Sequence, residues 1–256
     1  LNVTTGIAQI LRLCEQALSA LNTDWTLILG HVLIGAAGKS HEIPAAQQII
    51  HELGLSGRLF TLDALHGQEN DGIRSATGNH LNVQVKANQP MLFQHLTETD
   101  PAPPPQDRHH THEIGRHHRI ERRLTQPSAY RSGLVPKRGN RLRTLVEIQR
   151  HTEVFDTRKK EGVLRQETAD YVSTVPLSAA NAAQAVRAHW GIENRLHDLR
   201  DITVGENARR IPGFFALLRS FALNLLRFNG VTHISLGLYD NALHFDRLLA
   251  YQGLWR

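Results

Sequence analysis

Three observations in the sequence predict an α/β protein. Residues 25–34 are rich in β-branched and aliphatic side chains, residues 42–53 carry a helical pattern, and residues 58–64 form a second short apolar run. This order of strand, helix and strand is typical of a parallel crossover. Residues 80–87 alternate apolar and polar side chains, which predicts a further strand, and residues 214–228 predict a long core helix.

Composition limits the classes of protein that the chain can represent. Its 256 residues are enough for one sizeable core, or for a core with a smaller inserted region. A net charge of +5 and a pI near 9.7 favour an anionic partner, with nucleic acid first and a membrane surface second. The single cysteine, Cys14, excludes a disulfide framework and a cysteine zinc site, and suits a reducing cytosol. No apolar run reaches the roughly 18 residues of a transmembrane helix, so we expect a cytoplasmic protein, with nucleic acid and not a membrane as its partner.

The N-terminal elements are predicted from the spacing of apolar residues and from the positions of proline and glycine. Apolar residues at positions 7, 10, 11, 14, 18 and 21 predict an amphipathic helix over residues 7–21. Residues 25–34, with Gly30 inside, predict a strand or a tight hairpin. The helix over 42–53 has Pro44 in its first turn and Gly54 at its end.

A candidate site lies where the strand over 58–64 ends. Asp63 stands at that end, and ligands of such sheets gather beyond the carboxyl ends of strands. The alternative is that Asp63 is only a helix cap or a turn residue. A helix is expected over 68–76. If the strands over 58–64 and 80–87 are neighbours, Lys86 lies near the same sheet edge as Asp63.

The character of the chain changes after residue 97. Residues 100–107 are a proline-rich linker, and residues 109–123 combine histidines with arginines. This spacing matches no common structural zinc pattern and the arginines would repel a cation, so a phosphate-facing segment is favoured over a metal site. A loop is expected over 128–140, followed by strands at 144–150 and 171–175.

A second candidate site lies on the next predicted helix. Pro176 and Ser178 supply its start signals. His189, Glu193 and His197 are four residues apart and share one face, where a carboxylate between two imidazoles can bind a divalent metal. The alternative is a solvated face beside a packed Trp190.

Several motifs together resemble the insertion-sequence DDE transposases that include the H-repeat-associated proteins. The resemblance runs from about residue 25 to the end, with the motifs in the family's order. They are Lys39-Ser-His-Glu-Ile-Pro-Ala45, Thr61-Leu-Asp-Ala-Leu-His-Gly-Gln68, Val83-Gln-Val-Lys-Ala-Asn-Gln-Pro90, Gly115-Arg-His-His-Arg-Ile-Glu-Arg122, His189-Trp-Gly-Ile-Glu-Asn-Arg-Leu-His197 and Leu217-Leu-Arg-Ser-Phe-Ala-Leu-Asn-Leu-Leu-Arg227.

The resemblance implies an RNase H-like core in which three carboxylates hold two Mg²⁺ or Mn²⁺ ions. Asp63 would be the second carboxylate and Glu193 the third. Residues 1–96 would form a partial core, 97–176 a linker and a β-rich insertion, and 177–256 the catalytic helix with a C-terminal helical region. The residues implied as contacts to DNA phosphates are Lys86, Arg116, Arg119, Arg122, Arg187 and Arg195.

The chain also departs from the family's pattern. The family's first aspartate lies in an Asp-Gly-Lys motif at the end of the first core strand, and no such motif occurs in this sequence. That strand would fall at or before Leu1, and the setting of Asp24 does not support it as a substitute. Asn207 stands where the family has an acid.

These departures lead us to expect a truncated or inactive copy of a transposase, associated with the bacterial nucleoid, whose DNA partners are the ends of an insertion sequence and a target site. An oligomer is compatible with this expectation. The main alternative is a non-catalytic DNA-binding remnant, and a weaker one is an RNA-binding or structural α/β protein.

Overall fold

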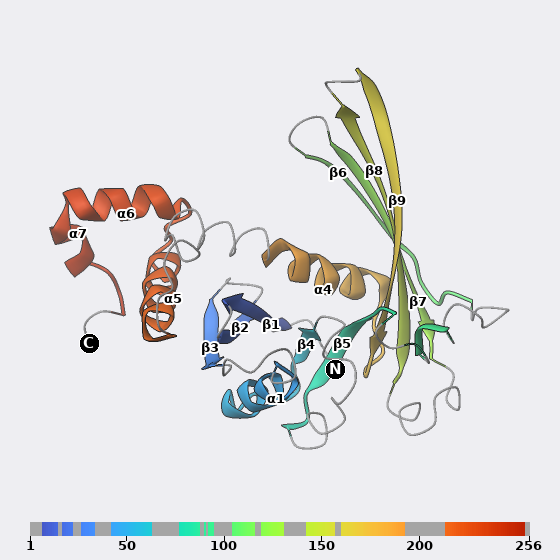
Figure 1. The fold of residues 1–256 in the computed structure, drawn as a ribbon, viewed down its shortest axis with the longest axis horizontal. Coiled ribbons are helices and arrows are strands. Elements are labelled where there is room, and N and C mark those ends of the chain that lie inside the picture. Colours follow the sequence, from blue (N-terminus) through green and yellow to red (C-terminus); the bar gives the residue numbers. More distant parts are fainter. Residues whose placement is uncertain are drawn as a thin grey trace. The chain divides into compact units, whose positions relative to one another are not determined.

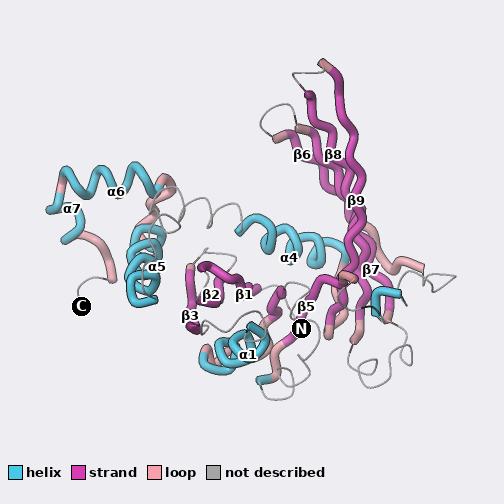
Figure 2. The backbone as a smooth tube through the Cα atoms, viewed as in Figure 1, coloured by secondary structure: helices cyan, strands magenta, loops and turns pink. Residues whose placement is uncertain are grey.

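The structure, a computed structural model, describes residues 7–14, 17–22, 27–33, 42–62, 77–87, 90, 92–94, 104–115, 119–130, 142–156, 160–192 and 213–253. The chain divides into two compact units, and Figures 1 and 2 show their elements. The first unit is Leu1–Phe60 with Ala188–Arg256, and the second is Thr61–Arg187. Both contain strands, and helices accompany them, so the predicted α/β class is confirmed.

The first unit contains an antiparallel meander of β1 (Ile7–Cys14), β2 (Ala17–Asn22) and β3 (Ile28–Leu33). The helix predicted over residues 7–21 is therefore wrong. Ala8 pairs with Asn22 and Arg12 with Leu18, so the two halves of that segment face each other across a ladder. Because β2 also pairs with β3, backbone pairing on both of its edges outweighs the helical spacing of the sequence.

The crossover after β3 contains α1 (Glu42–Glu52), close to the predicted helix. Its buried face consists of Ala45, Ala46, Ile49 and Ile50, and Gly54 follows it with a φ of +60°, a conformation that favours glycine. The connection leads to β4 (Leu59–Leu62) at the boundary of the two units. In the strand order β3-β2-β1-β4, two strands separate the strands that α1 connects.

In the described part of the second unit, the strands that follow β4 lie in the order β5-β9-β8-β7-β6. They are β5 (His80–Val85), β6 (His109–Ile114), β7 (Ile120–Ala129), β8 (Thr144–Asp156) and β9 (Glu161–Ser173). Each neighbouring pair is antiparallel. The strands predicted over 80–87 and 144–150 are confirmed. The histidine-rich segment forms the β6–β7 hairpin, and β7 extends to Ala129 into the start of the predicted loop.

The helix predicted from Ser178 is α4 (Ala179–Ile192). Its start is fixed twice: the Ser178 hydroxyl accepts a hydrogen bond from the Asn181 N–H at 3.2 Å, and the Asp107 carboxylate accepts one from the Ala179 N–H at 2.9 Å. The first of these caps was predictable from the local sequence. The second comes from 72 residues away.

Three further helices, in the first unit, follow: α5 (Gly213–Phe228), α6 (Ile234–Leu243) and α7 (Phe245–Leu249). Leu223 and Leu226 of α5 pack with Ile234 in a small buried cluster, as the core prediction requires. Leu217 and Phe221 on another face of α5 are exposed, so only part of this helix is core. In the described part of the chain, no helix is long and apolar enough to cross a membrane.

Candidate functional site

Four of the predicted site residues lie outside the described residues: Asp63, Glu193, Arg116 and Arg195. Their nearest described neighbours are still informative. Asp63 directly follows β4, whose four residues are all buried. Glu193 directly follows Ile192, the last described residue of α4.

The metal-binding face predicted on the helix after Ser178 includes His189, which is described, whereas Glu193 and His197 lie outside the described residues. Its side chain is 8% exposed, and its ring lies 6.1 Å from the Trp190 ring at 84° in an edge-on arrangement. Burial and an aromatic neighbour fit a packed histidine. Among the described residues, no group of three or more histidine, cysteine, aspartate or glutamate side chains could hold a metal ion.

Lys86 lies directly after β5 and has an exposed side chain. Three other predicted phosphate contacts are described: Arg119, Arg122 and Arg187. Strand register decides which of these can share a surface, because directly opposite residues in a ladder project from the same face.

Register assigns the charged side chains of the four strands β6–β9 to two faces. One row across the sheet contains Thr111, Arg123, Arg150 and Glu167. The neighbouring row, on the opposite face, contains His112, Arg122, His151 and Gln166.

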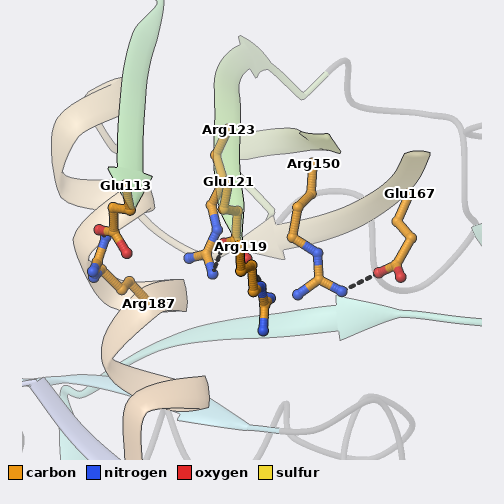
Figure 3. A network of polar contacts seen from close by, with 7 residues as sticks. All are labelled: Glu113, Arg119, Glu121, Arg123, Arg150, Glu167 and Arg187. Atoms are coloured by element: carbon orange, nitrogen blue, oxygen red, sulfur yellow. Dashed lines mark hydrogen bonds and ion pairs between the residues drawn. The ribbon is translucent and has the colours of Figure 1, made fainter. Parts of the chain in front are cut away.

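Arg187 of α4 forms an ion pair with Glu113 of β6, on the face that carries Arg123 (Figure 3). Arg122 therefore projects from the other face of the sheet. There it pairs with Glu153 at 2.5 Å, and both side chains are largely exposed. The structure thus separates Arg122 from Arg187, although both were assigned from the sequence to one basic surface.

The centre of the network in Figure 3 is Glu121, whose carboxylate is paired with both Arg119 and Arg123. Burial of Glu121 by itself raises the pKa of the carboxyl. The charges and hydrogen bonds of Arg123 and Arg119 outweigh burial, so the pKa of Glu121 is lowered overall. A second pair on the same face joins Arg150 to Glu167.

A pocket of about 200 Å³ lies between α4 and the strands β6, β7 and β8 in the second unit. Its lining combines hydrogen-bonding and apolar side chains and includes no carboxylate: His109, Thr111, Arg123, Thr125, Ile148, Ala180, Ala183, Gln184, Val186 and Arg187. Of these, the sequence predicted Arg187 as a single phosphate contact, while His109, Thr111 and Arg123 belong to the segment 109–123 that it predicted to face phosphate. Residues 109 and 111 are two apart in the sequence, as are 123 and 125, so each pair shares one face if its segment is a strand. Only the register shows that the two pairs lie side by side.

Curated proteins are similar to this chain over most of its length. It is 30% identical to "Putative transposase YncI" of Escherichia coli O157:H7 over 226 residues, 82% of this chain and 55% of that protein. It is 27% identical to "H repeat-associated putative transposase YhhI" of Escherichia coli (strain K12) over 234 residues, 88% of this chain and 58% of that protein. "Putative protein YbfL" of the same strain is 28% identical over the same shares.

The chain therefore spans little more than half the length of the curated relatives that it matches. No family model and no solved structure matches it. The resemblance predicted from the motifs is nevertheless confirmed: over most of its length the chain is a homologue of proteins named putative transposases, among them an H repeat-associated one.

Proposed function

We propose that the chain is a DDE-type transposase-derived protein with an RNase H-like core, whose reaction type is phosphodiester cleavage and strand transfer on the DNA of an insertion sequence. The observation that carries this proposal is homology, over 82–88% of the chain, to proteins named putative transposases. The α/β order of the first unit is compatible with it.

Asp63 and Glu193 are proposed as the metal-binding carboxylates. Carboxylate oxygens are the donors that Mg²⁺ and Mn²⁺ prefer, and the position of Asp63 directly after a buried strand supports this role. When bound in such a site, two ions activate the attacking hydroxyl and stabilise the leaving oxygen. The protein's part is to hold the two carboxylates in place and to orient the DNA backbone.

Two carboxylates supply less negative charge than the three that the family uses, so this chain should hold two cations weakly. The absence of an Asp-Gly-Lys motif from the sequence favours a second candidate function. In that alternative the chain holds DNA as a non-catalytic remnant. Both functions share the same basic contacts and differ only in cleavage.

The proposed DNA contacts are Lys86, Arg116, Arg119, Arg122, Arg187 and Arg195. The ion pairs of Arg119, Arg122 and Arg187 with glutamates are consistent with this role, because a phosphate can replace a carboxylate as the partner of a guanidinium with little loss of hydrogen bonding. The net charge of +5 adds a favourable long-range term.

The test is nicking of supercoiled plasmid in Mg²⁺ or Mn²⁺, together with DNA binding at several salt concentrations. Asp63→Asn and Glu193→Gln are the site variants, and Asp246→Asn, on the exposed side of α7, is the control. Cleavage that both site variants lose and the control keeps supports an active transposase. Salt-sensitive DNA binding without cleavage supports the remnant, and a chain that neither binds nor cleaves DNA rejects both.

A further inference from the structure

The pocket beneath α4 is lined by hydrogen-bond donors and by apolar side chains. Six of its lining residues can donate a hydrogen bond, when His109 is counted with Thr111, Arg123, Thr125, Gln184 and Arg187, and none is acidic. Ile148, Ala180, Ala183 and Val186 complete the wall. Positive groups beside an apolar wall act in a medium of low dielectric constant, which strengthens their attraction for an anion.

The two arginines remain able to bind a further group although each has a glutamate partner. A guanidinium has five N–H donors, and a carboxylate engages two of them at most. Glu113 pairs with Arg187 and Glu121 with Arg123, yet neither glutamate lines the pocket. Each arginine therefore keeps N–H donors beyond those that its glutamate can engage, and both arginines line the pocket.

Strand register adds a second, independent observation. Arg123 of β7 lies directly opposite Arg150 of β8. Like charges in directly opposite positions destabilise a sheet. Glu121 and Glu167 offset part of this repulsion, and an anion beside Arg123 would offset it further. Thr111, opposite Arg123 on its other side, offers a hydroxyl to the same anion.

We propose that this pocket binds a phosphate group, held by Arg123 and Arg187 with Thr111 and Thr125. Planar guanidinium groups suit phosphate oxygens geometrically, and about 200 Å³ is several times the roughly 30 Å³ that one water occupies in the liquid. The phosphate belongs either to a nucleic-acid backbone or to a free ion. The first source rests on the proposed function, and the second does not.

The experiment measures binding of inorganic phosphate to the full chain by calorimetry, and of a DNA duplex by fluorescence anisotropy, both in a buffer free of sulfate. Arg187→Gln is expected to weaken phosphate binding about tenfold or more, because it removes a charged hydrogen-bond donor. Ala183→Leu fills the pocket from α4 and should abolish binding. Thr111→Val keeps a β-branched side chain and removes only the hydroxyl, so it remains informative if Ala183→Leu fails to fold.

Two controls match these changes outside the pocket. Thr168→Val makes the same substitution on the exposed opposite face of β9, and Arg143→Gln removes an exposed arginine before β8. Both should leave phosphate binding unchanged. Circular dichroism and thermal unfolding of each variant separate loss of the site from loss of the fold.

The outcomes distinguish the pocket from the proposed function. Loss of both phosphate and DNA affinity in Ala183→Leu and Thr111→Val assigns the pocket to nucleic-acid phosphate. Loss of phosphate affinity alone assigns it to a free ion, and this result stands even if the wild-type chain binds no DNA and the proposed function fails. The pocket proposal is overturned if the wild-type chain binds no phosphate, or if these variants bind it as well as the controls do.

Discussion

At the scale of single residues, Glu121 is the carboxylate that pairs with two arginines on the face of the sheet that carries Arg123. Its side chain is largely buried between Arg119 and Arg123. We expect Glu121→Gln to lower the free energy of unfolding at neutral pH by about 1.5–3 kcal/mol, the range for hydrogen bonds to charged groups. The lower end is the better estimate, because Arg119 is 47% exposed and solvent screens its charge.

The sign of the pH dependence follows from the lowered pKa of Glu121. Its stabilisation is present above the ordinary value of 4.5 and is lost as pH falls through the lower pKa of the folded state. Urea unfolding at neutral and acid pH measures it. Glu167→Gln, which breaks the more exposed pair with Arg150, is the control and should cost about 0–1 kcal/mol. Equal losses for the two variants at neutral pH would contradict the assignment.

Asp170 provides a prediction of opposite sign. It lies on β9 directly opposite Glu147 of β8. Burial, and secondarily the charge of Glu147, raise the pKa of the Asp170 carboxyl above its usual value. The ionised form therefore costs stability, and this cost appears as pH rises through the raised pKa. Asp170→Asn should increase the free energy of unfolding at neutral pH and have no such effect well below pH 3.8. A variant that is less stable at neutral pH would refute this reading.

At the scale of elements, Asn224 attaches α5 to the edge strand β3. Its side-chain oxygen accepts from the Ile28 N–H at 2.8 Å, and its side-chain nitrogen donates to the Ile28 carbonyl at 2.7 Å. An unpaired strand edge is a site of unwanted association, and this amide covers it. We expect Asn224→Ala to cost about 1–3 kcal/mol, because two part-buried hydrogen bonds are lost together.

Hydrogen exchange of the Ile28 amide is the direct measurement of this contact, and it should become faster in Asn224→Ala. Gln48→Ala removes an exposed side-chain hydrogen bond on α1 and serves as the control, with a change within about 0.5 kcal/mol. If Ile28 exchange stays unchanged while global stability falls, Asn224 acts elsewhere than at the strand edge.

The elements also show what the sequence could predict. The helix α1 and the strand β5 have strong periods and clear end signals, so their existence followed from local pattern. The helix prediction for residues 7–21 failed because apolar positions in a short segment fit a helical and a strand spacing about equally. Strand pairing, such as that of Arg12 with Leu18, distinguishes the two structures. Ser178 was predictable as a cap, whereas Asp107 meets α4 only through the fold.

At the scale of the whole molecule, the candidate site was predictable in composition and not in arrangement. Arginines and histidines in residues 109–123 indicated an anion-binding segment. Arg122 and Arg123 project from opposite faces because they are neighbours on one strand, and only the register shows that Arg123 shares its face with the pocket. The pocket combines β6, β7, β8 and α4, so no local window of the sequence contains it.

The salt dependence of DNA binding tests whether the ion pair of Arg122 with Glu153 competes with a DNA phosphate. If Arg122 contacts a DNA phosphate, Glu153 competes with that phosphate for the same guanidinium. Glu153→Gln should then tighten DNA binding and steepen the dependence of log K on log salt by up to about 0.9, the contribution of one phosphate contact to B-DNA.

Removal of an acidic group also raises the net charge, which strengthens binding without any specific contact. Asp240→Asn makes the same change of charge and releases Arg247 in the first unit, so it measures this general effect. The double variant Glu153→Gln with Arg122→Gln then isolates the contact: the extra gain over Asp240→Asn should disappear in it. A gain that persists without Arg122, or one no larger than that of Asp240→Asn, would show that this face of the sheet does not contact DNA.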